Sequence, residues 1–396
     1  MKNDDPISMD SPSTDQTAAL LPEGRPTSQR HVKKEATDGH KLVVQSLRAL
    51  GVTHAYCVSG TPIRETFGYC ASVGIRPIGV RHQQAAVMMA IAQNYVTGRL
   101  TAISLVSAGP AVTNAVTSVL VAQDNCWPVV VLGGRRPLSM QGMGSFQDLD
   151  AVPIFRSITK WSALVESTAS IPDYLEHAFK IALSGRPGPV YLDLPEDILT
   201  GIVRSYRLPR LEICRPSSPD EEAIDRAAEI LSRARRPSMI IGKGIRWSEP
   251  YAELARLADD FGIPFITSPM GRGYLPDDHP LCCNAARGIL QSKTDAVLLV
   301  GARLDWTFRF GTGIPPEAKI IQIDIHEPEI GVNVAPAVGI VGDAKEVLSR
   351  LVARLEIKTD GYYREKLSPW QAILNEAKEK KHREWNSLMN TDSLPM

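Results

Sequence analysis

The chain has 396 residues, with 44 lysines and arginines against 44 aspartates and glutamates, so its formal net charge is zero. At about 150 residues per domain, this length predicts two or three domains. The neutral balance argues against a protein that binds nucleic acid or a membrane surface through an overall positive charge. Hydrophobic residues make up 43% of the chain, enough for real cores, and no apolar run approaches the roughly 20 residues of a membrane-spanning helix.

The first residues are polar and contain no apolar segment of a secretory signal. The six cysteines show neither C-x-x-C nor Cys/His metal spacing. Both features fit a protein of the reducing cytoplasm. Residues 1–38, rich in Ser, Pro, Thr, Asp and Lys, are predicted to be a disordered tail.

Short apolar strands alternate with helices from residue 39 to residue 201. Asp38 is the predicted N-cap of the first helix, and Gly51 is its predicted stop. The predicted strands cover 55–58, 77–80, 101–106, 128–132 and 190–194, and later helices cover 83–95, 110–122 and 171–183. This alternation indicates a parallel sheet with helices on both faces.

The segment 202–219 contains prolines and basic residues and is predicted to link this domain to a second one, residues 220–356. Predicted strands there cover 238–241, 264–267, 296–300, 319–325 and 338–341, with helices over 251–261 and 345–355. Residues 357–396 are predicted to form one amphipathic helix, around 370–385, and a tail. The expected fold class is therefore α/β, with two doubly wound parallel-sheet domains.

Two glycine-containing turns and one acidic residue follow strands of the second domain, where open α/β sheets bind ligands. Gly242-Lys243-Gly244 and Gly271-Arg272-Gly273 either offer backbone N–H groups to a phosphate or are plain turns, because neither has the spacing of a specific phosphate loop. Asp324 either holds a ribose hydroxyl or caps a turn.

The first domain has three comparable positions. Residues 81–84 (RHQQ) lie between a strand and a helix, where they either serve a ligand or cap the helix. Residues 107–110 (SAGP), with Asn114 one turn later, permit either the close approach of a ligand or a tight turn. The loop 142–147 (GMGSFQ) is a candidate active-site flap. Spacing alone thus predicts a two-domain α/β protein with a ligand at its strand ends.

Three segments of the first domain together resemble the pyrimidine-binding domain of thiamine-diphosphate enzymes of the acetolactate-synthase type. They are 79–86 (GVRHQQAA), 106–114 (VSAGPAVTN) and 184–195 (SGRPGPVYLDLP). Four further segments look most like 2-hydroxyacyl-CoA lyases and oxalyl-CoA decarboxylases: 144–150 (GSFQDLD), 159–161 (TKW), 301–306 (GARLDW) and 321–325 (IQIDI). The resemblance covers about residues 39–396 and implies a pyrimidine-binding domain followed by a central Rossmann-like domain.

The sequence departs from that family in two ways. The family binds the cofactor diphosphate and its Mg²⁺ through a third domain with a Gly-Asp-Gly and Asn-Asn signature, and neither motif occurs in this chain. The resemblance therefore implies thiamine diphosphate and Mg²⁺ held with a separate diphosphate-binding subunit, in a hetero-oligomer, with no metal ligand in this chain. The family's His-Glu pair is here His82-Gln83, and glutamine has no titrating carboxylate.

Residue by residue, the resemblance implies one site in the first domain. Gln83 and Pro110 would lie near the aminopyrimidine, and Ser59, Gly60 and His82 near the reacting carbon. Phe146 and Gln147 match the pair that faces the substrate in the family. The candidate catalytic residues are His82, Gln83, Phe146 and Gln147. The candidate cofactor-binding residues of this domain are Ser59, Gly60, Pro110 and Asn114.

In the central domain, Lys243, Arg303 and Asp324 match positions that hold an ADP-type nucleotide in the decarboxylase branch. A further basic nucleotide contact of that branch is Leu164 here, which argues against bound ADP, and FAD fits no better. The expected function is one subunit of a two-component thiamine-diphosphate lyase, decarboxylase or carboligase acting on small molecules, with neither nucleic acid nor membrane as partner. The alternative is a non-catalytic regulatory or assembly paralogue, which both departures favour.

Overall fold

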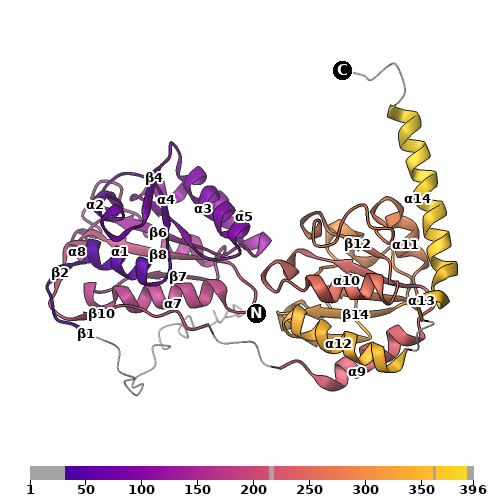
Figure 1. Cartoon of the computed structure of the whole chain (residues 1–396). Coiled ribbons are helices and arrows are strands. Elements are labelled where there is room, and N and C mark those ends of the chain that lie inside the picture. Colours follow the sequence, from indigo (N-terminus) through magenta and orange to yellow (C-terminus); the bar gives the residue numbers. More distant parts are fainter. Residues whose placement is uncertain (1–31, 214–217, 360–362, 390–396) are drawn as a thin grey trace, which may run out of the picture.

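The structure is a computed structural model that describes residues 32–213, 218–359 and 363–389. These residues form two α/β domains, each built on a parallel sheet (Figure 1). The predicted fold class is confirmed. Within the described ranges, no helix combines the length and the apolar composition that crossing a membrane requires.

The sheet of the first domain has six parallel strands in the order β4-β3-β5-β6-β8-β7. Their bounds are β3 His54–Val58, β4 Arg76–Gly79, β5 Ala102–Val106, β6 Val129–Arg135, β7 Trp161–Leu164 and β8 Pro189–Pro195. β5, β6 and β8 are buried along their whole length, in agreement with their apolar sequences. Because all six strands are parallel, the loops that follow them share one edge of the sheet.

Helices lie on both faces of this sheet. Their bounds are α1 Gly39–Ala49, α2 Arg64–Tyr69, α3 Gln83–Thr97, α4 Pro110–Thr113, α5 Val116–Asn125, α6 Val152–Arg156, α7 Ile171–Leu183 and α8 Glu196–Thr200. Neighbouring residues of a strand point to opposite faces. In β5, Ile103 and Leu105 join the core that α1 and α7 cover, whereas Ala102 and Val106 join the core that α3 and α5 cover.

The boundaries predicted for the tail and the linker differ from the structure. Val32–Lys33 (β1) pairs antiparallel with Tyr206–Arg207 (β10), and Thr37–Asp38 (β2) pairs with Ile202–Val203 (β9). Residues 32–38 and 202–207 are therefore part of the first domain. Two-residue strands are too short to show hydrophobic alternation, so periodicity cannot reveal them. The predictions for residues 1–31 and 214–217 fall outside the described residues.

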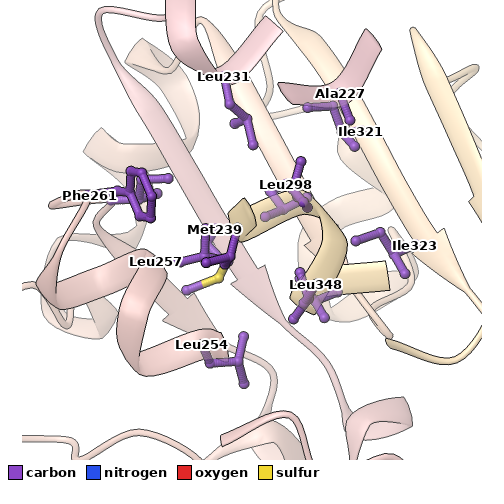
Figure 2. Packing of buried hydrophobic residues seen from close by; sticks show 14 of the residues in the cluster. Ala227, Leu231, Met239, Leu254, Leu257, Phe261, Leu298, Ile321, Ile323 and Leu348 are labelled. Atoms are coloured by element: carbon purple, nitrogen blue, oxygen red, sulfur yellow. The ribbon is translucent and has the colours of Figure 1, made fainter. Parts of the chain in front are cut away.

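The second domain has a five-stranded parallel sheet in the order β12-β11-β13-β14-β15. Its strands are β11 Pro237–Ile241, β12 Phe265–Thr267, β13 Ala296–Val300, β14 Lys319–Asp324 and β15 Val338–Val341, with helices α9 Glu221–Arg233, α10 Tyr251–Asp259, α11 Arg287–Lys293 and α12 Ala344–Lys358. Met239 of β11, Leu257 of α10 and Leu348 of α12 lie in one apolar core between sheet and helices (Figure 2).

The C-terminal helix predicted around 370–385 lies within α14, Ser368–Met389, which follows the short helix α13, Tyr363–Lys366. Trp370 and Leu374 are buried against the second domain, and the Trp370 indole donates to the Pro237 carbonyl oxygen at 3.0 Å. The remainder of α14 extends away from the domain (Figure 1). This half of the helix exposes Trp385 and Met389.

Two cations of the second domain contact the C-terminal ends of α3 and α5 in the first. Arg246 Nη2 donates to the Tyr95 carbonyl oxygen at 2.7 Å, and Lys243 Nζ donates to that of Asp124 at 2.8 Å. The last carbonyls of a helix lack partners within the helix and carry partial negative charge, so cations are favourable there. These contacts join the second domain to α3 and α5, the helices that begin beside the candidate site.

Candidate functional site

The first candidate site lies at the C-terminal edge of the first sheet, where the loops after β3 and β5 touch. The Ala108 N–H donates to the Thr61 carbonyl oxygen at 3.2 Å. A Cβ on Gly60 would lie 2.8 Å from both Cβ and Oγ of Ser107. That is too close for any larger residue, so glycine at position 60 is what allows the two loops to approach.

Ser59 and Pro110 are exposed on this edge. Pro110 is the first residue of α4, where a missing backbone N–H removes no helical hydrogen bond. Gly109 precedes it with φ 63° and ψ −117°, a backbone conformation that residues with a side chain rarely adopt. The SAGP segment is therefore a tight turn, as one of its two interpretations predicts, and the same turn presents Pro110 at the site.

Gln83 and Asn114 contact each other directly. Gln83 is the first residue of α3, and Asn114 follows the last residue of α4. The Asn114 Nδ2 donates to the Gln83 Oε1 at 3.0 Å. The structure thus brings together two predicted site residues that are 31 positions apart in the sequence, and it leaves the Gln83 side-chain NH₂ to donate elsewhere.

His82 is the N-cap of α3. Its Nδ1 accepts a hydrogen bond from the Gln84 N–H at 3.1 Å, which satisfies one of the helix's first N–H groups. The capping interpretation of residues 81–84 is therefore correct for His82. Because Nδ1 accepts, the ring proton of the neutral imidazole resides on Nε2. His82 is exposed at this edge of the sheet.

The flap loop places its two predicted residues differently. Gln147, at φ 59°, packs against the SAGP turn, because a Cβ on Gly109 would lie 2.8 Å from the Gln147 Cβ and 2.9 Å from its carbonyl oxygen. Phe146 is 77% exposed and points away from the apolar cores. The structure therefore brings Gln147 to the site and leaves Phe146 at the surface.

A partly buried charge cluster next to this loop was not among the predicted site residues. Arg135, at the end of β6, lies 3.1 Å from the Asp150 carboxylate and 3.4 Å from that of Asp193 in β8. The Tyr191 hydroxyl donates to the other oxygen of Asp193. Burial raises the pKa of Asp193 to about 6, against the lowering effects of Tyr191 and Arg135. The signal in the sequence was one charged residue in each of two otherwise apolar strands, VVVLGGR and PVYLDLP.

Lys243 and Arg303, the predicted nucleotide contacts, lie between the two domains. Besides the Asp124 carbonyl, Lys243 Nζ donates to Asn125 Oδ1 at 3.2 Å. Arg303 Nε lies 3.3 Å from the Glu329 carboxylate, and its Nη2 donates to Cys126 Sγ at 3.4 Å. Both cations are thus engaged with protein groups, and a bound phosphate would have to replace those contacts.

Asp324 ends β14, and its Oδ1 accepts from the His326 N–H at 2.9 Å, so it caps a turn. It also lies 3.9 Å from the Arg186 guanidinium of the first domain. Burial raises the pKa of Asp324 above its ordinary value. Asp324 lines a hollow of about 200 Å³ between the domains, bounded by residues 183–185 and Pro187 on one side and by Gly301, 323–325 and 342–344 on the other.

The first site offers hydrogen-bond partners for a heteroaromatic ring rather than a titrating acid. The Gln83 amide both donates and accepts but does not exchange a proton, whereas a carboxylate at this position would. Among residues 32–213, 218–359 and 363–389, no group of three or more His, Cys, Asp or Glu side chains is placed to hold a metal ion.

Two stretches of the chain match known protein families. Residues 37–154 match the thiamine pyrophosphate enzyme N-terminal TPP binding domain, and residues 224–351 match the thiamine pyrophosphate enzyme central domain. The first stretch contains every predicted site residue of the first domain. The second contains Lys243, Arg303 and Asp324.

Three curated proteins are similar over most of this chain. The 2-hydroxyacyl-CoA lyase 1 of Mus musculus is 34% identical over 383 residues, 95% of this chain and 65% of that protein. The oxalyl-CoA decarboxylase of Escherichia coli K12 is 30% identical over 372 residues, 91% of this chain and 65% of that protein. A probable acetolactate synthase of Mycobacterium bovis is 32% identical over 313 residues, 78% and 57%. This chain therefore spans less than two thirds of each relative's length.

Proposed function

The chain carries the N-terminal and central domains of the thiamine pyrophosphate enzymes, and from this premise we propose that it is one subunit of a two-component thiamine-diphosphate-dependent enzyme that breaks or forms a carbon–carbon bond. The reaction class is lyase, decarboxylase or carboligase, and the substrates are 2-oxo acids or 2-hydroxyacyl- or oxalyl-CoA-like molecules. The names of the three relatives support this range of reactions.

One observation carries the proposal: at the edge of the first sheet, Asn114 is hydrogen-bonded to Gln83, and Gln147 packs against the turn at Gly109 that opens the short helix before Asn114. When bound there, the cofactor supplies a nucleophilic carbon and an electron sink. Gln83 orients the aminopyrimidine through a hydrogen bond, and Gln147 faces the substrate. Because Gln83 moves no proton, we expect activation to be slower by roughly the 10² to 10⁴ that general acid–base assistance supplies.

The diphosphate and its Mg²⁺ are proposed to bind through a separate subunit in a hetero-oligomer, located in the cytoplasm. Two facts support this arrangement. The alignments with two of the relatives leave about 35% of each relative's length uncovered. The sequence also contains neither Gly-Asp-Gly nor Asn-Asn. A nucleotide such as ADP or FAD in the hollow beside Asp324 is disfavoured, because Lys243 and Arg303 already bind protein groups.

A second candidate function is a non-catalytic regulatory or assembly subunit of such an enzyme. It is favoured by the amide at position 83 in place of a carboxylate and by the use of His82 Nδ1 as a helix cap. Under this alternative, the two domains would keep the surface through which subunits of such an enzyme assemble. The site would no longer activate the cofactor.

Calorimetric titration separates these functions. Thiamine diphosphate and Mg²⁺ are titrated into this chain alone, and then into its mixture with the candidate diphosphate-binding protein. Tight binding in the mixture only supports a shared site and leads to an activity screen with 2-oxo acids and acyl-CoA esters. No binding in either titration, with a folded partner, contradicts the enzyme and favours the non-catalytic subunit.

A further inference from the structure

The loop 138–150 crosses the site edge between two anchored ends. At its first end, the Leu138 N–H donates to the Asp197 carboxylate of α8 at 3.0 Å. The neighbouring Arg136 lies 2.8 Å from the Glu196 carboxylate of the same helix. The start of the loop is therefore joined to α8 by one hydrogen bond and one ion pair.

At the second end, Asp150 is joined to the core through Arg135. A single nitrogen, Arg135 Nη1, reaches both the half-exposed Asp150 carboxylate and the fully buried Asp193 carboxylate. Asp193 is in turn fixed by the Tyr191 hydroxyl, and the Tyr191 ring stacks on Phe155 with centroids 4.0 Å apart. The loop end is thus connected, through one guanidinium, to a rigid part of the sheet.

Between these ends the loop has little that would fix it. Gly142 and Gly144 both have φ 76°, and Met143 and Phe146 are more than three-quarters exposed. Its contact with the site is Gln147 against Gly109. The loop's apolar contact with a core lies next to its second end, where the half-buried Leu149 packs against the cluster under α3 and α5. Residues 141–148 have few buried apolar contacts, which is the property of regions that open locally at low free-energy cost. Their position therefore depends on the two ends, and Leu149 and Asp150 act together at the second.

We propose that Arg135 is a positioning residue, which holds Gln147 at the site by joining Asp150 to the buried Asp193. Arginine suits this role because its planar guanidinium presents several donors at once, whereas a lysine ammonium is a flexible point charge. The catalytic consequence for Gln147 rests on the proposed function. The restraint of the loop does not depend on it.

Hydrogen–deuterium exchange of the full chain tests the restraint without cofactor or partner. Asp150→Ala removes the loop-side carboxylate and leaves the buried pair intact. We expect the hydrogen-bonded amides of the loop, those of Gln141, Met143 and Asp148, to exchange about tenfold faster in this variant, while the amides of β6 and β8 keep their protection. Asp148→Ala is the matched control, because Asp148 is an exposed carboxylate of the same loop that lies two residues from Asp150. Unchanged exchange in Asp150→Ala, or an equal rise in both variants, would overturn the proposal.

Two substitutions of Arg135 test the geometry of the contact. Arg135→Met should release the loop as Asp150→Ala does, and Arg135→Lys should restore only part of the protection. Full protection in Arg135→Met would also overturn the proposal.

In the assembled enzyme, Asp150→Ala should lower kcat/KM for the substrate and leave the affinity for thiamine diphosphate unchanged. Faster exchange in Asp150→Ala, together with a wild-type assembly that shows no activity, would contradict the proposed function alone and leave the restraint established.

Discussion

Asn114 donates a hydrogen bond to the Gln83 side-chain oxygen at 3.0 Å, and this bond joins the end of α4 to the start of α3. Asn114 stands at the break between α4 and α5, and Gln83 is the first residue of α3. An amide at position 83 makes this contact without charge. A carboxylate there would accept the same hydrogen bond from Asn114 and would also titrate.

Gln83→Glu should therefore increase the activity of the assembled enzyme. The substitution keeps the acceptor for Asn114 and adds the acid–base group that the amide lacks, which is worth roughly 10² to 10⁴ in rate. The measurement is the steady-state rate with saturating thiamine diphosphate and Mg²⁺. Gln84→Glu is the control, because it introduces the same charge one position further along α3. No gain in Gln83→Glu, or an equal gain in both variants, would contradict a role for Gln83 at the ring.

Asp193→Asn should change how stability depends on pH. Burial raises the folded-state pKa of Asp193 from 3.8 to about 6, so between these values the folded protein keeps a proton that the unfolded chain has released. The contribution of this residue is therefore greatest below pH 4 and falls by up to about 3 kcal/mol as the pH rises to 6. The asparagine variant has no such titration.

The measurement for Asp193 is urea unfolding of both proteins from pH 4 to pH 8. The free energy of unfolding of the wild type minus that of Asp193→Asn should decrease between pH 4 and 6 and then stay level. A difference that increases with pH would mean that Arg135 stabilises the Asp193 carboxylate more than burial destabilises it.

Most strands of the two parallel sheets were predictable because they are short apolar runs, and Asp38 was predictable as a cap because its side chain precedes a periodic segment. The break of the predicted helix 110–122 was not, since no glycine or proline marks it. The strand 161–164 is half-buried and lies at the sheet edge, so its sequence, WSAL, shows no clear alternation. The edge position follows from pairing with β8 alone.

The sequence predicts only the part of the site that lies near strand ends, where ligands of parallel sheets are expected. This part contains Gln83, Asn114 and Gln147. Arg135, Asp150 and Asp193 are separated by up to 58 positions, and they meet because β6 and β8 pair in a register that sets Gly133 beside Asp193. A single sequence contains no record of that register. For Asp324 the sequence allows two roles, a ribose contact or a turn cap. In the structure its side chain caps a turn.

Gly133→Ala should destabilise the first domain. A Cβ at position 133 would lie 2.0 Å from the Tyr191 Oη and 2.6 Å from its Cζ. The Tyr191 ring is fully buried and stacked on Phe155, so it cannot move away freely. Overpacking of this kind costs about 1–3 kcal/mol. Thermal unfolding should show a clearly lower Tm.

Gly68→Ala is the matched control for Gly133→Ala. Position 68 lies within α2, and a Cβ there would meet no atom within 4 Å. Alanine is favoured over glycine inside a helix by up to about 1 kcal/mol, so this variant should be as stable as the wild type or slightly more stable. Equal Tm values for the two variants would contradict the packing of Tyr191 against Gly133.

Arg246→Met should loosen the contact between the two domains. The Arg246 side chain is 14% exposed. Its guanidinium donates to the Tyr95 carbonyl oxygen from Nε at 3.1 Å and from Nη2 at 2.7 Å. Hydrogen bonds of a charged group are worth about 1.5–3 kcal/mol each, and methionine replaces the stem but not the donors. We expect a larger radius of gyration by small-angle X-ray scattering and a thermal transition that separates into two steps. Arg226→Met should leave both unchanged, because Arg226 is an exposed residue of α9, a helix that packs on α12 and β15 of the second domain. A single transition and an unchanged radius in Arg246→Met would mean that Lys243 and Arg186 hold the domains together without Arg246.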